Sequence, residues 1–520
     1  MKYAVDSKTM KSIDDYTIET VKIPATVLME RAAYEIAAVM KEKIQKTDRI
    51  LVICGPGNNG GDGIAAGRIL YLQGYLVAIL FIGDENKCSK EMKAQYEIAK
   101  NLGIKIKEDY DISKYNIIID AIFGIGLTRQ VNGKQEEIIK KLNAENHIVY
   151  SVDIPSGISA DNGKIMNTAV KATYTITFGY QKQGLLVYPA AEYAGKITVV
   201  DIGFPKVAAK HAILDTFYFE LEDLHQIPLR TSHSNKGTFG KVLVIAGSLG
   251  MSGAAYLSAK AAYRTGAGLV KILTSADNRM ILQTSLPEAL FAAYDEKGLD
   301  ALQHKQELLE NLNWASAIVI GPGLGLSDTA EQLLLTVIEK AKVPVVFDAD
   351  ALTLLSMLLD KQSNSRQERI KYLSTLLKDN MILTPHLKEL SRLLGIEVTE
   401  IVNNVIDTAK QCSYNNKLIV VMKDARTIVT QQQSKYINTS GNNGMATGGS
   451  GDVLTGIIAS LIVQGMEPYQ AACLGVYIHG LAGDIAAKEK GTYSMMASDI
   501  INSIEKVLIS SNYSELPRIT

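Results

Sequence analysis

The sequence predicts an α/β protein built from two successive units. Short β-branched runs recur along the chain, and each is followed by a glycine-containing loop and a segment with helical character. Continuous apolar runs of this kind are typical of parallel strands covered by helices on both faces. Their alternation with helical segments indicates α/β architecture in both halves. A length of 520 residues also favours more than one domain.

The strand pattern is interrupted once. In the first half we expect strands at Ile50–Cys54, Leu76–Ile82, Ile117–Asp120, His147–Val152 and Lys196–Val200. In the second half we expect them at Lys241–Ala246, Leu269–Leu273, Ala317–Ile320, Pro344–Phe347, Met381–Leu383 and Leu418–Met422. The β/α rhythm is lost between Pro205 and His233, so we expect one domain over residues 1–215 and another over 225–515.

Composition excludes several classes of function. The net charge is −1 with both signs mixed along the chain, which gives no support for binding nucleic acid or an anionic membrane. The four cysteines form no CxxC pair, so a zinc site or disulfide framework is not expected. The N-terminus is polar, and no apolar run approaches the roughly 18 residues of a membrane span. These features predict a soluble, cytoplasmic protein.

A glycine-rich segment, Gly55–Gly63, follows the first strand and precedes an expected helix at Ile64–Gln73. Such a strand-to-helix turn exposes backbone N–H groups and a helix N-terminus, which suits phosphate binding. It is neither a GxGxxG fingerprint nor a Walker loop. On its residues alone, phosphate binding and a purely structural turn remain equally open.

Two more strand ends in the first half carry aspartates. Asp120 and Asp153 each lead into a segment with glycine and polar oxygens. The carboxyl ends of parallel strands meet at the ligand crevice of an open sheet. Either aspartate alone could be an N-cap. Together with Asn59 and Ser156, Asp120 could supply oxygen ligands to a monovalent or divalent cation.

The second half contains the longest glycine and amide segment, Asn438–Asp452, followed by an expected helix over Val453–Gln464. Asp452 could be a helix N-terminal carboxylate that stabilises the helix by roughly 0.3–1 kcal/mol. It could instead be a general base beside amides that hold a transferring phosphoryl group. A segment of this length exceeds what capping requires, which favours the catalytic interpretation.

The first half resembles the NAD(P)H-hydrate epimerase family. The resemblance rests on Gly55–Gly63, on Asp120 with Phe123–Gly126, and on Val152–Gly157, and it extends from Leu28 to Gly203. It implies a Rossmann-like three-layer domain, with Asp153 acting at the reacting ring and K⁺ bound by Asn59, Asp120 and Ser156. It also implies substrate contacts from Asn58, Asn59, Gly60, Gly61, Asp62, Gly124, Ile125, Gly126, Leu127, Thr128, Arg129 and Gln130, besides Asp153. Arg31, where the family more often has Asn, departs from the pattern.

The second half resembles the ADP- or ATP-dependent NAD(P)H-hydrate dehydratases, which have a ribokinase-like α/β fold. The motifs that carry the resemblance are Lys236–Val242, Gly247-Ser248, Met251–Ala254, Thr265–Val270, Ile320–Gly325, Asp348–Leu352, Leu383–Glu389, Lys423 and the glycine segment ending at Asp452. Lys388 departs from the family pattern, which has glycine at this position, but the neighbouring His386 is retained.

This second resemblance implies phosphorylation-assisted dehydration of the hydrate, with Asp452 catalytic. Ala254, Gly325, His386 and Asp452 would face the hydrate. The nucleotide-binding residues would be Lys423, Asp424, Ala425, Arg426, Thr427, Asn442, Asn443, Gly444, Met445, Ala446, Thr447, Gly448, Gly449, Ser450 and Gly451. Mg²⁺ is expected with the nucleotide, because metal ions neutralise phosphate charge during transfer.

The leading hypothesis is a bifunctional repair enzyme that acts on hydrated NADH and NADPH (NADHX and NADPHX) with ADP, and we expect a homo-oligomer. The order of the two halves resembles the microbial enzymes, which favour ADP. Two alternatives remain: a ribokinase-like vitamin or sugar kinase, and a first half that only binds nucleotide or protein. For His386, a purely structural role is the alternative. The position of Trp314 before a strand is explained by packing. Asp348 and Asp350 could bind a metal ion or could hold neighbouring residues by hydrogen bonds.

Overall fold

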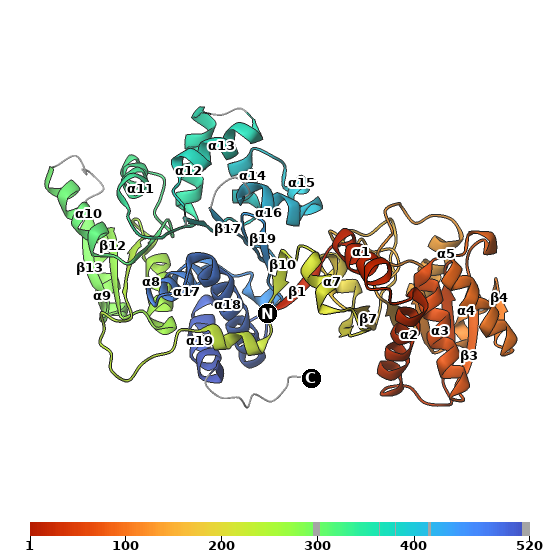
Figure 1. Ribbon diagram of the computed structural model, residues 1–520. Coiled ribbons are helices and arrows are strands. Elements are labelled where there is room, and N and C mark those ends of the chain that lie inside the picture. Colours follow the sequence, from red (N-terminus) through yellow and green to blue (C-terminus); the bar gives the residue numbers. More distant parts are fainter. Residues whose placement is uncertain (295–301, 363–364, 380, 414–417, 512–520) are drawn as a thin grey trace. The chain divides into compact units, whose positions relative to one another are not determined.

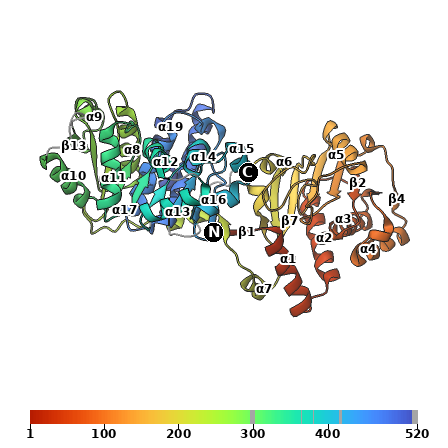
Figure 2. The same ribbon diagram turned by 90° about the horizontal axis from the view of Figure 1, so that it is seen from above.

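The chain forms two compact units in the computed structural model, which describes residues 1–294, 302–362, 365–379, 381–413 and 418–511. The N-terminal unit contains Tyr3–Phe217. The C-terminal unit contains Met1–Lys2 together with the chain from Tyr218 onward. The division falls inside the stretch where the strand pattern of the sequence is interrupted. Figures 1 and 2 show both units as helices packed on sheets.

The N-terminal unit is built on a seven-stranded sheet in the order β4-β3-β2-β5-β6-β7-β9. All neighbouring strands in it are parallel. The strands are β2 (Arg49–Cys54), β3 (Leu76–Phe81), β4 (Lys105–Lys107), β5 (Ile117–Ala121), β6 (Ile148–Val152), β7 (Tyr174–Phe178) and β9 (Lys196–Val200). A short strand, β8 (Gln181–Lys182), pairs with β1 (Lys2–Val5) through Ala4 and Val5.

Helices cover both faces of this sheet. One face carries α2 (Ala25–Lys41), α3 (Asn58–Leu72) and α4 (Lys90–Asn101), and the other carries α5 (Lys134–Ala144). The unit also contains α1 (Ser7–Asp15), α6 (Ala190–Tyr193) and α7 (Lys206–His211). Alternate residues of β2 point to opposite faces: Val52 packs in a core with α2, α3 and α4, and Ile53 packs in a second core with α5. Burial on both faces explains why these strands are continuous apolar runs.

The C-terminal unit contains a nine-strand array in the order β13-β12-β11-β14-β15-β16-β17-β18-β19. The pairs from β13 to β17 are parallel, and β17-β18-β19 is antiparallel. The strands are β11 (Lys241–Ile245), β12 (Leu269–Ser275), β13 (Leu290–Tyr294), β14 (Ala317–Ile320), β15 (Val345–Phe347), β16 (Ile382–Leu383), β17 (Ile419–Met422), β18 (Ile428–Gln431) and β19 (Ser434–Ile437). The short strand β10 (Thr216–Tyr218) spans the division between the units.

Helix α17 is central to the C-terminal unit and packs against α8, α18 and β14. Gly456 allows this close packing, because a Cβ there would lie 2.1 Å from the Ser258 carbonyl oxygen of α8. The helices are α8 (Ser252–Thr265), α9 (Arg279–Ser285), α10 (Leu302–Trp314), α11 (Asp328–Lys340), α12 (Asp350–Gln362), α13 (Arg366–Leu376), α14 (Leu387–Leu394), α15 (Val398–Asn403), α16 (Val405–Ser413), α17 (Ser450–Val463), α18 (Pro468–Lys490) and α19 (Ala497–Ser511).

The α/β prediction is confirmed in both units, and each expected run contains a strand. The expected helix starts were wrong, because α3 begins at Asn58 rather than Ile64 and α17 begins at Ser450 rather than Val453. In α3 the glycines allow the first turn to pack against the sheet, since a Cβ on Gly63 would lie 2.4 Å from the Ala121 Cβ. Among the described helices, none combines the length and apolarity needed to cross a bilayer.

Candidate active sites

The N-terminal unit has a cavity of about 950 Å³ at the carboxyl ends of its strands. Most of the residues predicted to contact substrate line it: Asn58, Asn59, Asp62, Gly124, Ile125, Gly126, Leu127, Thr128, Arg129 and Asp153. Gly60 and Gly61 are buried, and a Cβ on Gly60 would lie 2.0 Å from the Gly55 carbonyl oxygen. Gln130 is exposed, and Gln135 lines the cavity.

Asp153 follows β6 and is held by a buried ion pair. Lys182 Nζ lies 2.5 Å from Asp153 Oδ1, and the lysine side chain is 0% exposed. The Thr177 hydroxyl and the Phe178 N–H donate to the same oxygen at 3.0 and 3.1 Å. Asp153 also has a positive φ of 64°, a strained conformation for a non-glycine residue. This network holds a negative charge at the cavity wall.

The three predicted potassium ligands lie around the backbone of Phe123. The Asp120 carboxylate is buried and accepts the Ser151 hydroxyl at 2.7 Å and the Ser156 N–H at 2.9 Å. Ser156 Oγ accepts the Phe123 N–H at 2.9 Å, and the Asn59 amide donates to the Phe123 carbonyl at 3.0 Å. Burial raises the pKa of Asp120. Carboxylate, hydroxyl, amide and carbonyl oxygens are hard ligands that suit a monovalent or divalent cation.

Two further cavity residues were missed from the sequence, Asp14 and Lys182. Asp14 lies on α1, and its pKa is raised to about 6 by burial and by the carboxylates of Asp15 and Asp153, against the opposing effect of Lys182. Burial, together with the carboxylates of Asp153 and Asp14, raises the pKa of Asp62 well above its usual range. Neither Asp14 nor Lys182 belongs to a local sequence motif, and only the tertiary fold brings them to the cavity that contains Asp153.

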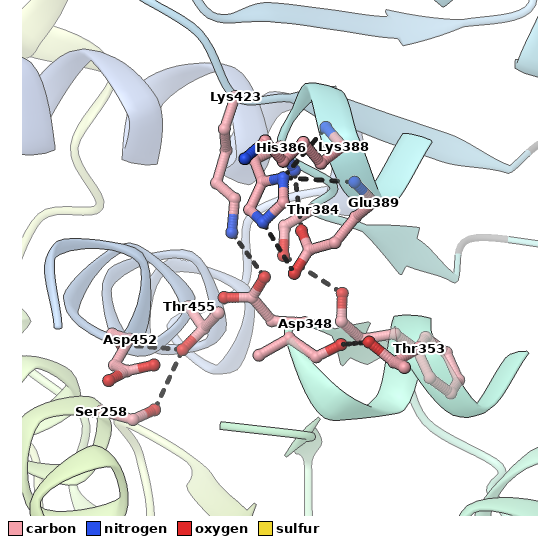
Figure 3. Close-up of polar contacts among 12 residues, drawn as sticks. Ser258, Asp348, Thr353, Thr384, His386, Lys388, Glu389, Lys423, Asp452 and Thr455 are labelled. Carbon is pink, nitrogen blue, oxygen red and sulfur yellow. Dashed lines mark hydrogen bonds and ion pairs between the residues drawn. The ribbon is translucent and has the colours of Figure 1, made fainter. Parts of the chain in front are cut away.

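The C-terminal unit brings together residues from the ends of several strands and from the N-terminus of α17. Asp452 lies in the first turn of α17, after Gly449 with a positive φ of 86°. Burial and the nearby Asp348 carboxylate raise the pKa of Asp452 to about 7, although Lys423 opposes the rise. A carboxyl group with such a pKa can exchange protons near neutral pH. Figure 3 shows Asp452 with Thr455 and Ser258 below the Lys423–Asp348 pair.

Lys423 follows β17 and forms an ion pair with Asp348, which follows β15. Lys423 Nζ lies 2.6 Å from Asp348 Oδ1. Burial lowers the pKa of Lys423, but the neighbouring carboxylates, Asp348 foremost, outweigh burial and raise it. Asp350 Oδ2 accepts the Gly325 N–H at 2.8 Å. Asp348 and Asp350 therefore both have supporting hydrogen-bond roles, one orienting Lys423 and the other the Gly325 turn.

His386 caps helix α14 and also faces the Lys423 region. Its Nδ1 accepts the backbone N–H groups of Lys388 and Glu389 at 3.1 and 3.2 Å. The backbone N–H of His386 donates to Glu389 Oε2 at 2.8 Å, which completes a capping box. Burial raises the pKa of Glu389 to about 7, while burial and Lys423 lower the pKa of His386. Lys388 contributes its N–H, so the departure from glycine preserves this cap.

The other predicted residues form two groups, one at the Gly325 turn and one at Lys423. Ala254 and the turn containing Gly325 lie together, because a Cβ on Gly323 would be 3.0 Å from the Ala254 Cβ. A Cβ on Gly451 would lie 3.2 Å from Lys423 Nζ, so this glycine adjoins the Lys423–Asp348 pair. Lys423 begins the β17–β18 turn, which contains Asp424, Ala425, Arg426 and Thr427.

Two residues of α18 that contact the glycine segment Asn438–Asp452 were missed. Asp484 accepts the Gly441 N–H and the Asn442 side-chain amide, both at 2.9 Å. His479 Nε2 lies 3.3 Å from the Ser450 hydroxyl, and burial lowers the pKa of His479 to about 4. The imidazole is therefore neutral beside the α17 N-terminus. Both His479 and Asp484 lie in a mostly apolar helix and belong to no motif, so the sequence gives no signal for them.

Fold and geometry define the class: an α/β protein with two polar sites, each formed at the carboxyl ends of parallel strands and beside a glycine-rich helix start. The family model described as NAD(P)H-hydrate dehydratase matches residues 242–506. The model described as YjeF-related protein N-terminus matches residues 25–184. Each match lies within one of the two units.

Similarity to curated proteins spans both units. The bifunctional NAD(P)H-hydrate repair enzyme of Thermofilum pendens is 33% identical, covering 96% of this chain and 95% of the relative. That of Moorella thermoacetica is 34% identical, with coverage of 97% and 96%. A solved ribokinase-like superfamily protein from Enterococcus faecalis is 28% identical, covering 57% of this chain and 97% of that chain, with a TM-score of 0.49. The chain belongs to the bifunctional NAD(P)H-hydrate repair enzyme family.

Proposed function

We propose that the N-terminal unit interconverts the R and S forms of hydrated NADH or NADPH, and that the C-terminal unit dehydrates the S form with ADP. The observation that carries this proposal is the presence of two separate sites with different reactive carboxyl groups. Asp153 is paired with a buried lysine in a cavity, whereas Asp452 lies at the N-terminus of α17. Similarity to bifunctional repair enzymes over nearly the whole chain supports the same assignment.

In the N-terminal unit, Asp153 is the base that acts at the hydrated carbon. Inversion there requires proton transfer, which a carboxylate at the cavity wall provides. The cavity of about 950 Å³ is at the upper end of the range for small-molecule sites. The exposed cations Lys8, Lys11, Lys87 and Arg129 line it as well. They suit the phosphates of a dinucleotide.

In the C-terminal unit, Asp452 removes the proton of the hydrate hydroxyl while the hydroxyl oxygen attacks the terminal phosphoryl group of ADP. AMP leaves with the electrons of the broken P–O bond. The C–O bond of the phosphorylated hydrate then breaks, phosphate takes that electron pair, and the neighbouring ring carbon loses a proton. The N–H groups at the start of α17 and the Lys423 ammonium stabilise phosphate charge.

The same sites are suited to the two expected ions. We propose that Asn59, Asp120 and Ser156 hold K⁺, which would neutralise the buried Asp120 charge and order the Phe123 loop. In the C-terminal unit, Asp348 and Asp350 are already engaged by Lys423 and the Gly325 N–H. Mg²⁺ would therefore be held mainly through nucleotide phosphates and water, as is usual for this ion.

ADP is the proposed phosphoryl donor, because the order of the two units resembles the microbial enzymes that favour it. The small-molecule kinase alternative makes a different product, since it would release a phosphorylated substrate rather than restored NADH. We further propose a cytoplasmic location, which the four free cysteines support. Homo-oligomerisation remains a prediction.

The function is tested by incubating the full chain with epimeric NADH hydrate and either ADP or ATP. Recovery of the near-ultraviolet absorbance of reduced nicotinamide measures repair, and the nucleotide products identify the donor. We expect recovery of both epimers with AMP and phosphate as products of ADP. No recovery with either nucleotide, or accumulation of a stable phosphorylated hydrate, would overturn the proposal.

A further inference from the structure

The N-terminal cavity has a second reactive carboxyl group that the proposed function leaves unused. Asp14 lies in the last turn of α1 and lines the same cavity as Asp153 and Lys182. It is only partly exposed, and its environment raises its pKa to about 6 through burial, Asp15 and Asp153, partly offset by Lys182. Asp14 and Asp153 therefore lie within electrostatic reach of each other, although they come from different elements.

Burial and the neighbouring carboxylates favour the protonated forms of both Asp62 and Asp14, because they raise the pKa of each group. Three carboxyl groups, Asp14, Asp62 and Asp153, accompany the buried ammonium of Lys182. The other charged groups that line the cavity are Lys8, Lys11, Asp84, Lys87 and Arg129, which are exposed, and Glu91, which is half-buried. Asp15 lies beside Asp14 on α1, and His211 of α7 stacks on the next residue, Tyr16. With Lys182 engaged by Asp153, carboxyl groups this close do not all ionise together.

The reaction requires two groups in opposite protonation states. The hydrate is a hemiaminal, in which one ring carbon carries a hydroxyl group and is bonded to the ring nitrogen. Opening the ring removes a proton from the hydroxyl and delivers one to the nitrogen. Oδ1 of Asp153 is engaged by Lys182, Thr177 and the Phe178 N–H, which leaves Oδ2 to accept the hydroxyl proton and calls for a second group to protonate the nitrogen. Lys182 stabilises negative charge on Asp153, which leaves the donor role to another group.

We propose that Asp14 is the general acid that acts opposite Asp153, an inference that rests on the proposed epimerase function. The hydroxyl proton passes to Asp153, the C–N bond breaks with its electron pair going to nitrogen, and nitrogen takes the proton of Asp14. The carbon becomes an aldehyde and can rotate. Ring closure on its other face returns one proton to Asp14 and one from Asp153 to oxygen. Atoms and charge balance, and no redox partner is needed.

The test uses Asp14→Asn in the full chain, with Asp15→Asn as the matched control on the same helix. Asp15 is exposed and does not line the cavity. Interconversion of separated R and S hydrates is followed without nucleotide, so the C-terminal unit cannot contribute. Chemical denaturation verifies that the N-terminal unit of each variant is folded, and dehydration of pure S hydrate with ADP verifies that the C-terminal unit is intact.

We expect Asp14→Asn to reduce kcat for epimerisation by about 100-fold with little change in KM. Asp15→Asn keeps the proposed acid and should lose little activity, but its decline in kcat should move to lower pH, because the Asp15 carboxylate helps to raise the pKa of Asp14. Asp14→Glu should retain more activity than Asp14→Asn. The parent kcat should fall as pH rises and deprotonates the acid, and Asp14→Asn should lack this decline. An unchanged kcat in Asp14→Asn, or a loss confined to KM, would overturn the inference. Failure of the parent chain to interconvert the epimers would instead overturn the proposed epimerase function.

Discussion

The two glycine segments look alike in sequence, but Gly55 and Gly60 of the first and Gly448 of the second serve different physical purposes. In the first, a Cβ on Gly55 would lie 2.2 Å from the Ile122 carbonyl oxygen, and one on Gly60 would lie 2.0 Å from that of Gly55. In the second, a Cβ on Gly448 would meet no atom within 4 Å. Gly55 and Gly60 are needed for close backbone packing, whereas Gly448 leaves space beside a helix N-terminus that suits an anion.

Asp153 and Asp452, the proposed catalytic aspartates of the two units, differ in whether a lysine contacts them directly. Asp153 contacts a fully buried ammonium directly. In the C-terminal unit the corresponding ammonium, Lys423, contacts Asp348, and burial raises the pKa of Asp452 to about 7. A direct ion pair keeps negative charge in place, while a buried carboxyl group without one can gain and lose a proton near neutral pH.

The largest expected effect is that of Asp452→Asn, which removes the proposed base of the C-terminal unit. Dehydration of S hydrate should slow by about 10³-fold, as expected for loss of general base catalysis. Epimerisation by the N-terminal unit should continue at the parent rate. Asp328→Asn is the control, because Asp328 is an exposed first-turn residue of α11. Equal activity of the two variants would reduce Asp452 to a helix-terminal carboxylate.

Lys182→Met tests whether the buried ion pair is what distinguishes the N-terminal site. Leaving Asp153 without its ammonium should reduce epimerisation by about 100-fold and destabilise the unit by about 3–5 kcal/mol. Epimer interconversion and chemical denaturation measure the two effects. Lys114→Met, which removes an exposed pair with Asp111, should leave the stability of the unit nearly unchanged. Similar small losses in both variants would contradict a special role for Lys182.

Replacing single glycines by alanine in each segment tests whether they are needed for backbone packing or for space at the helix N-terminus. Gly60→Ala should destabilise the N-terminal unit by about 1–3 kcal/mol, because the added methyl group would overlap backbone atoms. Gly57→Ala, where a Cβ meets nothing within 4 Å, is the control for stability. Gly448→Ala should leave the free energy of unfolding nearly unchanged but weaken nucleotide binding by about tenfold. A large loss of stability in Gly448→Ala would remove the distinction between the segments.

The smallest expected effect is a pH dependence of dehydration. As a base, Asp452 must be ionised, so kcat should fall as pH drops through its raised pKa of about 7. Glu389, whose pKa burial also raises to about 7, could produce the same profile. In Asp452→Asn the remaining rate should lose this dependence, whereas Glu389→Gln should keep it. If Glu389→Gln lost the pH dependence and Asp452→Asn kept it, Glu389 would be the titrating group.

Much of the fold could be predicted because its evidence is local. Continuous apolar runs identified the main strands, and glycine segments at strand ends marked both sites. The antiparallel pair β18–β19 and the starts of α3 and α17 were not predicted, because they depend on packing rather than on periodicity. Lys182 escaped prediction for the same reason: it follows β7 in no motif, and only the folded chain places its ammonium on Asp153.

The central claim is that one chain performs two consecutive reactions in separate units, and Asp153→Ala tests it most directly. Pure R hydrate and pure S hydrate are each supplied with ADP, and early rates of NADH recovery are compared, because spontaneous epimerisation contributes later. The account predicts that the variant repairs S hydrate at the parent rate and R hydrate slowly. Equally fast repair of both epimers by Asp153→Ala would contradict it.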